Sequence, residues 1–405
     1  MSREVRRDNR RRILRTGESQ NKEGRYVYKY INSLGEQKFI YSWKLVPTDR
    51  VPKGKRDDIS LREKIAEVQR DLSDGIDTAG KKMTVCQLYE KKNNLRKNIR
   101  RNTVKGRQQF MNVLKKDPFG SMSIDSVKQS DAKEWAIRMS ENGIAYNSIK
   151  NYMRSLRASF YMAIQDDYVR KNPFDFVLSD ILDDTRKEKT ALSLEQEEAL
   201  LTFAKSDRTY KKYYDELVIL LETGLRISEF CGLDLNVAVD MKNKSILVEH
   251  QLLKDTETGY YIEKPKTKSG IREIPMTDKA YDAFQRLIKS RKKTEPIVID
   301  GYSNFLMLNG KGLPQVASSY NMVLKGLVKK YNKTHDDELP EISPHSLRHT
   351  FCTKMANKGM TPNTLQYIMG HSDISMTLNY YAAHLVLQKL KWKGYVRCSK
   401  YGTYY

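Results

Sequence analysis

Histidines are concentrated in one stretch of this 405-residue sequence, where four of the six fall between positions 345 and 384. His345 and His349 are four positions apart, which puts both on one face of a helix and could suit zinc. However, the sequence lacks the glutamate that accompanies such a pair in zinc proteases, and Arg348 beside the pair would repel a cation. For any one of these histidines alone, a structural role is the simpler interpretation.

Arg348 changes that interpretation. It follows His345 by three positions, so on a helix the donors of both side chains point to the same side. The guanidinium fork matches two phosphate oxygens, and the imidazole adds one more donor. The pattern therefore predicts a site for an anion rather than for a metal.

A second arginine, Arg226, lies in the segment TGLRISE at 223–229. Gly224 is expected to end one helix, and Ser228 and Glu229 to open the next. Alone, Arg226 is more simply explained as an ion-pair partner of Glu229. Together with His345 and Arg348, Arg226 is interpreted as the second of two arginines whose guanidinium groups bind a pentavalent phosphorane.

Motifs for other kinds of phosphate chemistry are missing from the sequence. It contains no Walker A motif, no Gly-x-Gly-x-x-Gly segment opening a helix and no carboxylate cluster for two Mg²⁺ ions. We therefore expect no nucleotide, metal or other cofactor.

The charge of the chain indicates its partner. There are 73 Lys and Arg against 50 Asp and Glu, a net charge of +23, which a polyanion such as nucleic acid would offset. An anionic membrane surface is the competing partner. Because the sequence has no run of eighteen apolar residues and no signal peptide, we expect a soluble cytoplasmic protein without a membrane partner.

The N-terminal region predicts a small sheet backed by a helix. Tyrosines alternate in RYVYKY (25–30), and KFIYSWKL (38–45) resembles the returning strand. A strand over Arg12–Arg15 would complete an antiparallel sheet. Ser60 and Glu63 form a capping box that opens a helix.

We assign residues 1–75 to a domain that lays this sheet in a DNA groove. The first 58 residues carry a net charge of +8, and aromatic residues are interleaved with the basic ones. A solvated basic surface on an ordinary small domain is the alternative. The candidate DNA-binding residues are Arg25, Tyr28, Lys38 and Trp43.

After a predicted linker at Asp74–Lys82, four helices are expected over Val85–Lys97, Val104–Lys116, Ser130–Glu141 and Ala145–Tyr168. Residues 81–116 hold twelve Lys and Arg against a single Glu, which favours a surface that follows DNA phosphates. A second linker is predicted over Val177–Lys189, so this domain would span 82–178. Its candidate DNA-binding residues are Lys91, Lys92, Arg96, Lys97, Arg100, Arg101, Lys105 and Arg107.

The remaining chain, assigned to a domain over 188–396, is predicted to contain both helices and strands. Ser193 and Gln196 cap a helix, and a second helix covers about Tyr210–Glu222. Short strands follow near 245–249, 260–263 and 272–275, and helices are then expected to about Trp392. The predicted fold class is multidomain α+β: a three-stranded sheet plus helix, a four-helix bundle, and a mostly helical catalytic domain with a small antiparallel sheet.

Four segments resemble the catalytic boxes of tyrosine recombinases, in the family's order and spacing. They are LLETGLRISEFCGL (220–233), PKTKSGIREIPM (265–276), PHSLRHTF (344–351) and MGHSDISMTLNYY (369–381). The head segment RILRTGESQNKEGRYVYKY is most similar to integrases of conjugative transposons. The resemblance covers the whole chain, and four boxes in order are highly specific.

The resemblance implies a role for each site residue. Arg226 and Arg348 would contact the non-bridging oxygens of the scissile phosphate, and Glu229 would support the site from behind. His345 and His371 would donate to the same phosphate or shuttle the proton of the nucleophile.

Two candidate residues remain for the general acid, and two for the nucleophile. A lysine on a hairpin between two strands would protonate the leaving 5′ oxygen; Lys266 is favoured, with Lys268 the alternative. By spacing from the second histidine, Tyr380 is the expected nucleophile, with Tyr381 the alternative. The two tyrosines would point about 100° apart on a helix, so only one can attack.

The resemblance also implies an assembly and partners. The expected form is a homotetramer on two double-stranded DNA sites, exchanging strands through a Holliday junction, with an excisionase or a host DNA-bending protein as possible partners. A C-terminal helix could start at Leu385–Trp392. A non-catalytic DNA-binding regulator and a type IB topoisomerase are the alternative functions.

Overall fold

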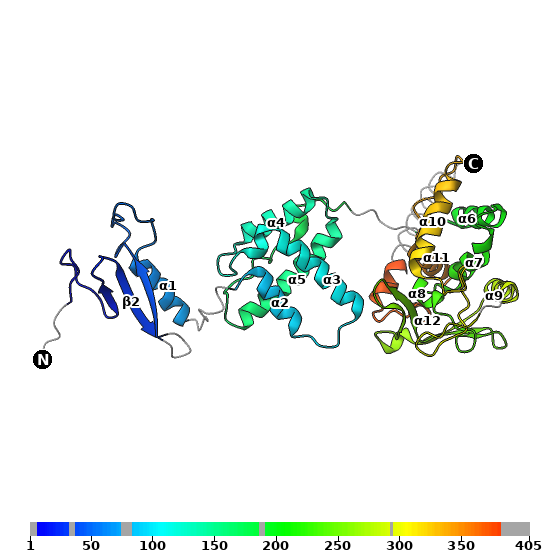
Figure 1. Cartoon of the computed structure of the whole chain (residues 1–405). Helices are drawn as coiled ribbons and strands as arrows, with labels where there is room; N and C mark the ends of the chain where they lie inside the picture. The colour runs from blue at the N-terminus through cyan, green and yellow to red at the C-terminus, as the bar shows by residue number, and fades with distance from the viewer. Residues whose placement is uncertain (1–5, 32–36, 74–82, 186–190, 292–294, 382–405) are drawn as a thin grey trace, which may run out of the picture. The chain divides into compact units, whose positions relative to one another are not determined.

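The computed structural model describes residues 6–31, 37–73, 83–185, 191–291 and 295–381. The chain divides into two compact units, Met1–Lys187 and Glu188–Tyr405. Three separate hydrophobic cores occur, two in the first unit and one in the second, and Figure 1 labels helices that contribute to each of them. The predicted linker at Asp74–Lys82 and the predicted C-terminal helix at Leu385–Trp392 lie outside the described residues.

The first core lies beneath an antiparallel sheet of β1 (Glu18–Gln20), β2 (Tyr26–Ile31) and β3 (Gln37–Ser42), in that order. The predicted strand at Arg12–Arg15 is wrong, because these residues follow a tight turn at Asp8–Arg12 and form only an isolated bridge between Arg7 and Ile13. Asp8 holds this turn by accepting from the backbone N–H of Arg10 and Arg12, at 2.9 and 2.8 Å.

Helix α1 (Leu61–Ser73) covers one face of this sheet. The predicted capping box is confirmed, since the backbone N–H of Ser60 donates to the carboxylate of Glu63 at 3.1 Å. Leu61 and Ile65, one turn apart, are buried against Tyr26 and Leu45. Apolar residues at helical spacing therefore meet apolar residues on alternate strand positions.

The second core is formed by the helices α2 (Val85–Asn94), α3 (Arg101–Lys116), α4 (Gln129–Glu141) and α5 (Tyr146–Gln165). Trp135 is fully buried among Phe110, Phe119 and Phe174. The second predicted linker starts too early, because Leu178 is buried in this same core. The four-helix prediction itself is confirmed.

The second unit starts with α6 (Leu194–Ser206), capped by Ser193 and Gln196 as predicted. It continues with α7 (Tyr214–Thr223) and the short α8 (Ile227–Cys231). The strands that follow are β4 (Val239–Asp240), β5 (Ser245–Val248), β6 (Gln251–Asp255), β7 (Gly259–Glu263) and β8 (Arg272–Pro275).

These strands form two sheets, not one. One sheet has the order β4-β5-β8, and the other is the hairpin β6-β7, which lies between β5 and β8 in sequence. The sequence analysis expected neither β6 nor this division. Helices α9 (Asp278–Ser290), α10 (Ala317–Tyr331), α11 (Pro344–Asn357) and α12 (Pro362–Met369) complete the unit.

The expectation that helices dominate after β8 is confirmed in part, because the described stretch 295–316 contains no helix. The predicted α+β fold class is confirmed. None of the helices in the described ranges is both long and apolar enough to cross a membrane.

Candidate active site

Two glycines end helices and turn backbone carbonyls toward arginines. Gly224 ends α7 with φ 62° and Gly370 ends α12 with φ 60°, both in the left-handed region that glycine adopts without strain. The Gly224 carbonyl accepts from Nη1 of Arg348 at 2.7 Å, and the Gly370 carbonyl accepts from Nη2 of Arg226 at 3.0 Å. Helix ends that are far apart in sequence therefore fix both predicted arginines.

The space at Gly224 is also restricted. A β-carbon there would lie 2.3 Å from Cδ1 of Phe351, so only glycine lets the end of α7 pack against α11. Helix α8 begins at Ile227, one residue before the predicted start at Ser228, with Arg226 at its N-cap. The expected ion pair forms, since Nη1 of Arg226 donates to Oε1 of Glu229 at 2.7 Å.

Glu229 joins Arg226 to a third arginine that the sequence analysis did not single out. Arg272 on β8 is buried and donates to both oxygens of Glu229, at 3.1 and 2.8 Å. Burial would raise the pKa of Glu229, but the hydrogen bonds and charge of Arg272, with the charges of Arg226 and Arg348, lower it to about 2. Glu229 is therefore ionised and supports the guanidinium of Arg226, which is the position predicted for it.

Arg348 is buried, and its second donor group, Nη2, reaches the carbonyl of Met369. Burial and the charge of Arg226 lower the pKa of Arg348 to about 9. Two guanidinium groups, those of Arg226 and Arg272, thus contact one carboxylate on which the charge of Arg348 also acts, so positive charge is in excess in this cluster. An excess of this kind favours binding of an anion.

His371 lies beside this cluster. It is buried, and its Nδ1 is 2.9 Å from Oγ1 of Thr377. Burial and the charges of Arg348, Arg226, Arg272 and His345 lower the pKa of His371 to about 4, so the imidazole is neutral at neutral pH. The residues whose charges act on His371 include all the arginines of the site.

The two candidate tyrosines point to different partners, as their positions on a helical segment at 375–381 require. Oη of Tyr380 lies 2.9 Å from Nδ1 of His349. Tyr381 instead donates to the carbonyl of Met360. Burial raises the pKa of Tyr380 to about 12, and the charge of Arg348 opposes that rise.

His349 is thus a residue of the site whose contact the sequence analysis missed. Its spacing from His345 was considered only for zinc, although the same spacing puts the two rings in edge-to-face contact, with centroids 4.6 Å apart. The contact of His349 with Tyr380 is tertiary and leaves no signal in local sequence. In the part of the chain that the structure describes, no group of three or more His, Cys, Asp or Glu side chains could hold a metal ion.

The two candidate lysines, Lys266 and Lys268, are exposed on the connection from β7 to β8. The expectation that they lie on a hairpin between two paired strands is wrong, because β7 pairs with β6 while β8 pairs with β5. The connection therefore links one sheet to the other, and it meets the arginine cluster at Gly270, whose carbonyl accepts from Nη1 of Arg272 at 3.1 Å, while both lysine side chains are exposed.

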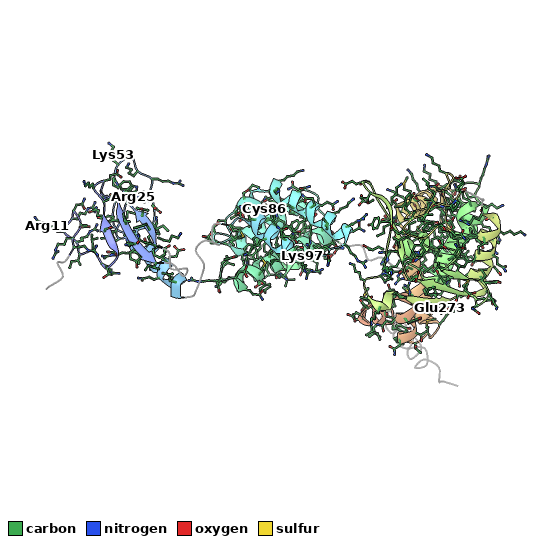
Figure 2. The ribbon with its side chains drawn as sticks, turned by 60° about the horizontal axis from the view of Figure 1, so that its bottom comes forward. Arg11, Arg25, Lys53, Cys86, Lys97 and Glu273 are labelled. Carbon is green, nitrogen blue, oxygen red and sulfur yellow. The ribbon has the colours of Figure 1, made fainter. Side chains whose placement is uncertain are left out.

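In the N-terminal sheet of β1, β2 and β3, successive side chains point to opposite faces, which divides the candidate DNA-binding residues between the two faces. Tyr28 and Lys38 lie on the side of Tyr26, the side that α1 covers. Arg25 stacks over Tyr41 and Trp43, with ring centroids 4.8 and 5.7 Å from its guanidinium carbon. The open face carries Val27, Lys29, Ile31, Phe39 and Tyr41, and Figure 2 labels the basic side chains Arg11, Arg25 and Lys53 on the head.

In the helical bundle, some candidates already have protein partners. Lys91 pairs with Asp166 at 3.0 Å, and Nζ of Lys92 donates to the Ser155 carbonyl at 3.0 Å. Arg96, Lys97, Arg101 and Lys105 are exposed around the start of α3, and Figure 2 labels Lys97. A DNA contact by any of them stays a prediction.

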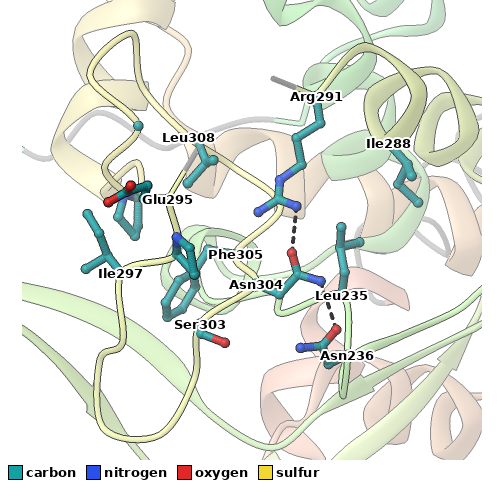
Figure 3. A pocket seen from close by; sticks show the side chains of 13 residues that line it. Leu235, Asn236, Ile288, Arg291, Glu295, Ile297, Ser303, Asn304, Phe305 and Leu308 are labelled. Atoms are coloured by element: carbon teal, nitrogen blue, oxygen red, sulfur yellow. Dashed lines mark hydrogen bonds between the residues drawn. The ribbon is translucent and has the colours of Figure 1, made fainter. Parts of the chain in front are cut away.

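A pocket of about 570 Å³ in the second unit lies elsewhere (Figure 3). Nη1 of Arg291 donates to Asn304 at 2.6 Å, and Asn304 donates to Asn236 at 2.8 Å. None of its lining residues belongs to the arginine cluster.

Comparisons with known proteins agree with this geometry. The model of the phage integrase family matches residues 190–386, the DNA-binding domain of Tn916 integrase matches 1–72, and the phage integrase SAM-like domain matches 84–181. The transposase from transposon Tn916 of Enterococcus faecalis is 66% identical over 94% of this chain and 93% of its own length. The chain therefore belongs to the phage integrase family of tyrosine recombinases, and it is a site-specific recombinase.

More particularly, the chain is similar to integrases of Tn916 type along nearly its whole length. The transposase from transposon Tn1545 of Streptococcus pneumoniae is 65% identical over 94% of this chain and 93% of that protein. A solved structure of the Tn1549 transposon integrase, in complex with a circular intermediate DNA, is 54% identical. The match covers 76% of this chain and 99% of the chain in that structure, with a TM-score of 0.72. The predicted family resemblance is confirmed.

Proposed function

We propose that this chain binds double-stranded DNA and cuts and rejoins it through a 3′-phosphotyrosine intermediate on Tyr380, to integrate and excise a mobile element. The observation that carries the proposal is the position of the Tyr380 hydroxyl. It lies against α11, the helix of Arg348, and the charge of Arg348 opposes the rise that burial causes in the pKa of Tyr380, whereas the Tyr381 hydroxyl is hydrogen-bonded to a backbone carbonyl.

The arginine cluster supports the proposed phosphate site. Two of the five N–H groups of the Arg226 guanidinium contact Glu229 and Gly370, and its side chain is 37% exposed, so further donors can reach a phosphate. Arg348 and neutral His371 would add donors to the same phosphate. Charge that develops on the phosphorane would then be stabilised by groups fixed beforehand.

The remaining step requires an acid for the leaving 5′ oxygen. We assign this role to Lys266, with Lys268 the alternative, because both are exposed lysines on the connection that leads into β8, the strand of Arg272. The phosphotyrosine conserves the energy of the broken phosphodiester, so rejoining would need no nucleotide.

Relatives add support for Tyr380 over Tyr381. Two solved forms of the Tn1549 integrase carry an arginine-to-lysine and a tyrosine-to-phenylalanine substitution. The two substituted positions are as far apart in that chain as Arg226 and Tyr380 are in this one.

The domain assignment is part of the proposal. Residues 1–75 would bind arm sites, and residues 82–178 and 188–396 would each bind the core site. The matched ranges 1–72, 84–181 and 190–386 and the three separate cores support these boundaries. Strand exchange between two sites would require a homotetramer, with an excisionase or a DNA-bending protein as a further partner.

The test uses a suicide DNA substrate, in which a nick next to the cleavage site lets a fragment diffuse away and traps the covalent complex. Tyr380→Phe should bind DNA yet form no covalent complex, and Tyr381→Phe should form it. The opposite result would assign the nucleophile to Tyr381. A second assay distinguishes a recombinase from a type IB topoisomerase, because a topoisomerase relaxes a supercoiled plasmid that carries no recombination site.

A further inference from the structure

We propose that His349 holds the hydroxyl of Tyr380 and takes its proton when the tyrosine attacks the phosphate. This inference rests on the proposed function, and it assigns the base to a residue other than His345 or His371. His349 lies on α11, directly after Arg348, and is half-buried. Its Nδ1 is 2.9 Å from Oη of Tyr380, with ring centroids 5.2 Å apart. This distance is within the reach that a general base needs.

A base is required because of the surroundings of the tyrosine. Burial raises the pKa of Tyr380 to about 12, so the phenolate is rare at neutral pH. An imidazole that already touches the hydroxyl can remove the proton as the oxygen–phosphorus bond forms, without first producing a free phenolate.

The other histidines of the site are placed for different roles. His371 is buried with its Nδ1 at 2.9 Å from Thr377, and the arginines lower its pKa to about 4, so it is a poor proton acceptor. His345 is exposed one turn before His349 and packs its ring edge-to-face with that of His349. It can therefore face the DNA phosphate while it fixes the orientation of the His349 ring.

The proton balance is complete. The O–H bond of Tyr380 breaks and its proton passes to Nδ1 of His349. The tyrosine oxygen bonds to phosphorus, and the bond from phosphorus to the 5′ oxygen breaks with a proton from Lys266. In the reverse step the 5′ hydroxyl attacks phosphorus and gives its proton back to Lys266, the bond from phosphorus to the tyrosine oxygen breaks, and His349 returns the proton to Tyr380.

Among the residues that the structure describes, the titratable groups beside this pair on α11 are His345, Arg348 and Cys352. The segment 375–381 contributes Tyr380 itself. The charge of Arg348 stabilises a developing phenolate and disfavours a lasting imidazolium next to it. Both effects suit a proton that is transferred and then returned.

The experiment measures single-turnover cleavage by the full chain on two suicide substrates: ordinary DNA, and DNA in which sulfur replaces the bridging 5′ oxygen. A sulfur leaving group needs no acid. His349→Asn keeps an acceptor near the Nδ1 position but cannot take a proton. We expect it to cleave both substrates about 100-fold more slowly, on the scale of general-base catalysis. Lys266→Ala should be slow only on ordinary DNA.

The matched control is His335→Asn, at an exposed histidine of the same unit that packs on Tyr331 with centroids 4.1 Å apart. It should cleave like the unmodified chain. DNA affinity and melting temperature of each variant show whether a loss of cleavage is a loss of folding.

The pH dependence separates a base from a structural support. With the sulfur substrate, the cleavage rate of the unmodified chain should rise with pH as His349 loses its proton and then level off. His349→Asn should lack that plateau. The inference is overturned if His349→Asn cleaves within threefold of the unmodified chain or keeps its pH profile, or if His345→Asn alone removes the plateau. Absence of any covalent complex with the unmodified chain would instead refute the proposed function.

Discussion

Glu229 accepts hydrogen bonds from both terminal nitrogens of Arg272, and the same carboxylate holds Arg226 through Nη1 and through its backbone N–H. Arg272 is itself fixed by donating from Nε to the Ile368 carbonyl at 2.6 Å. A buried pair thus links β8 and α12 to the exposed guanidinium that we assign to the phosphate. The position of Arg226 therefore depends on two buried side chains, those of Glu229 and Arg272.

Glu229→Gln should destabilise the second unit by roughly 3 kcal/mol, because it leaves Arg272 without its buried counter-charge. The pKa of Glu229 is lowered to about 2, so its stabilising contribution is present above the unfolded pKa of about 4.5 and is lost as pH falls toward 2. Urea unfolding at several pH values measures both effects.

Glu273→Gln is the control, because this neighbouring carboxylate is exposed (Figure 2). It should change stability by less than about 0.5 kcal/mol. If Glu229→Gln unfolds at the same urea concentration as this control, the buried pair does not stabilise the fold as described.

Arg226→Lys should bind DNA almost normally and cleave it about 100- to 1000-fold more slowly. Lysine keeps the charge but loses the fork that contacts two oxygens, so the transition state loses more than the ground state. A binding titration and a single-turnover cleavage assay on the same DNA separate the two quantities. Cleavage near the unmodified rate would remove Arg226 from the site.

The parts of this arrangement that could be predicted from the sequence are those whose determining residues lie within a few positions of one another. The caps at Ser60 and Ser193 predicted helix starts correctly, because a capping box satisfies backbone groups within four residues. Likewise, the glycine at 224 correctly predicted the break before Arg226. The β6-β7 hairpin was missed, since its pairing inserts between strands that pair with each other.

The site shows the same limit. The residue types of Arg226, Arg348 and Tyr380 could be chosen from spacing, and so could the pairing of Arg226 with Glu229. Their other partners are distant in sequence: the carbonyls of Gly224, Met369 and Gly370 and the side chain of His349. Nothing local indicates that Arg272 is buried against Glu229 or that His349 meets Tyr380. The strand expected at Arg12–Arg15 failed for a related reason, because the side chain of Asp8 holds the backbone there in a turn.

Deletion of residues 1–75 should abolish binding to separate arm sequences and leave core-site cleavage intact. The head has its own core around Tyr26, Leu45 and Leu61, so its removal exposes no other core. Gel-shift titrations with arm DNA and core DNA test this. Unchanged affinity of the shortened chain for arm DNA would show that the arm-binding assignment is wrong.

Cleavage should proceed at the same rate in EDTA and without nucleotide. The arginine cluster supplies the positive charge that a metal ion would supply, and the attacking atom is a side-chain oxygen rather than water. Added salt should weaken binding, because a chain with a net charge of +23 binds DNA largely through counterion release. Loss of cleavage in EDTA by a complex formed beforehand, at constant ionic strength, would require a metal in the mechanism.

The central claim is that Tyr380 attacks DNA, and mass spectrometry of the trapped complex tests it most directly. The unmodified chain is reacted with a suicide substrate and digested with protease and nuclease, and the peptide that carries nucleotide is sequenced. Our account predicts a 3′-phosphate ester on Tyr380 and none on Tyr381. A nucleotide on Tyr381, on any other residue, or attached through a 5′ phosphate would contradict it.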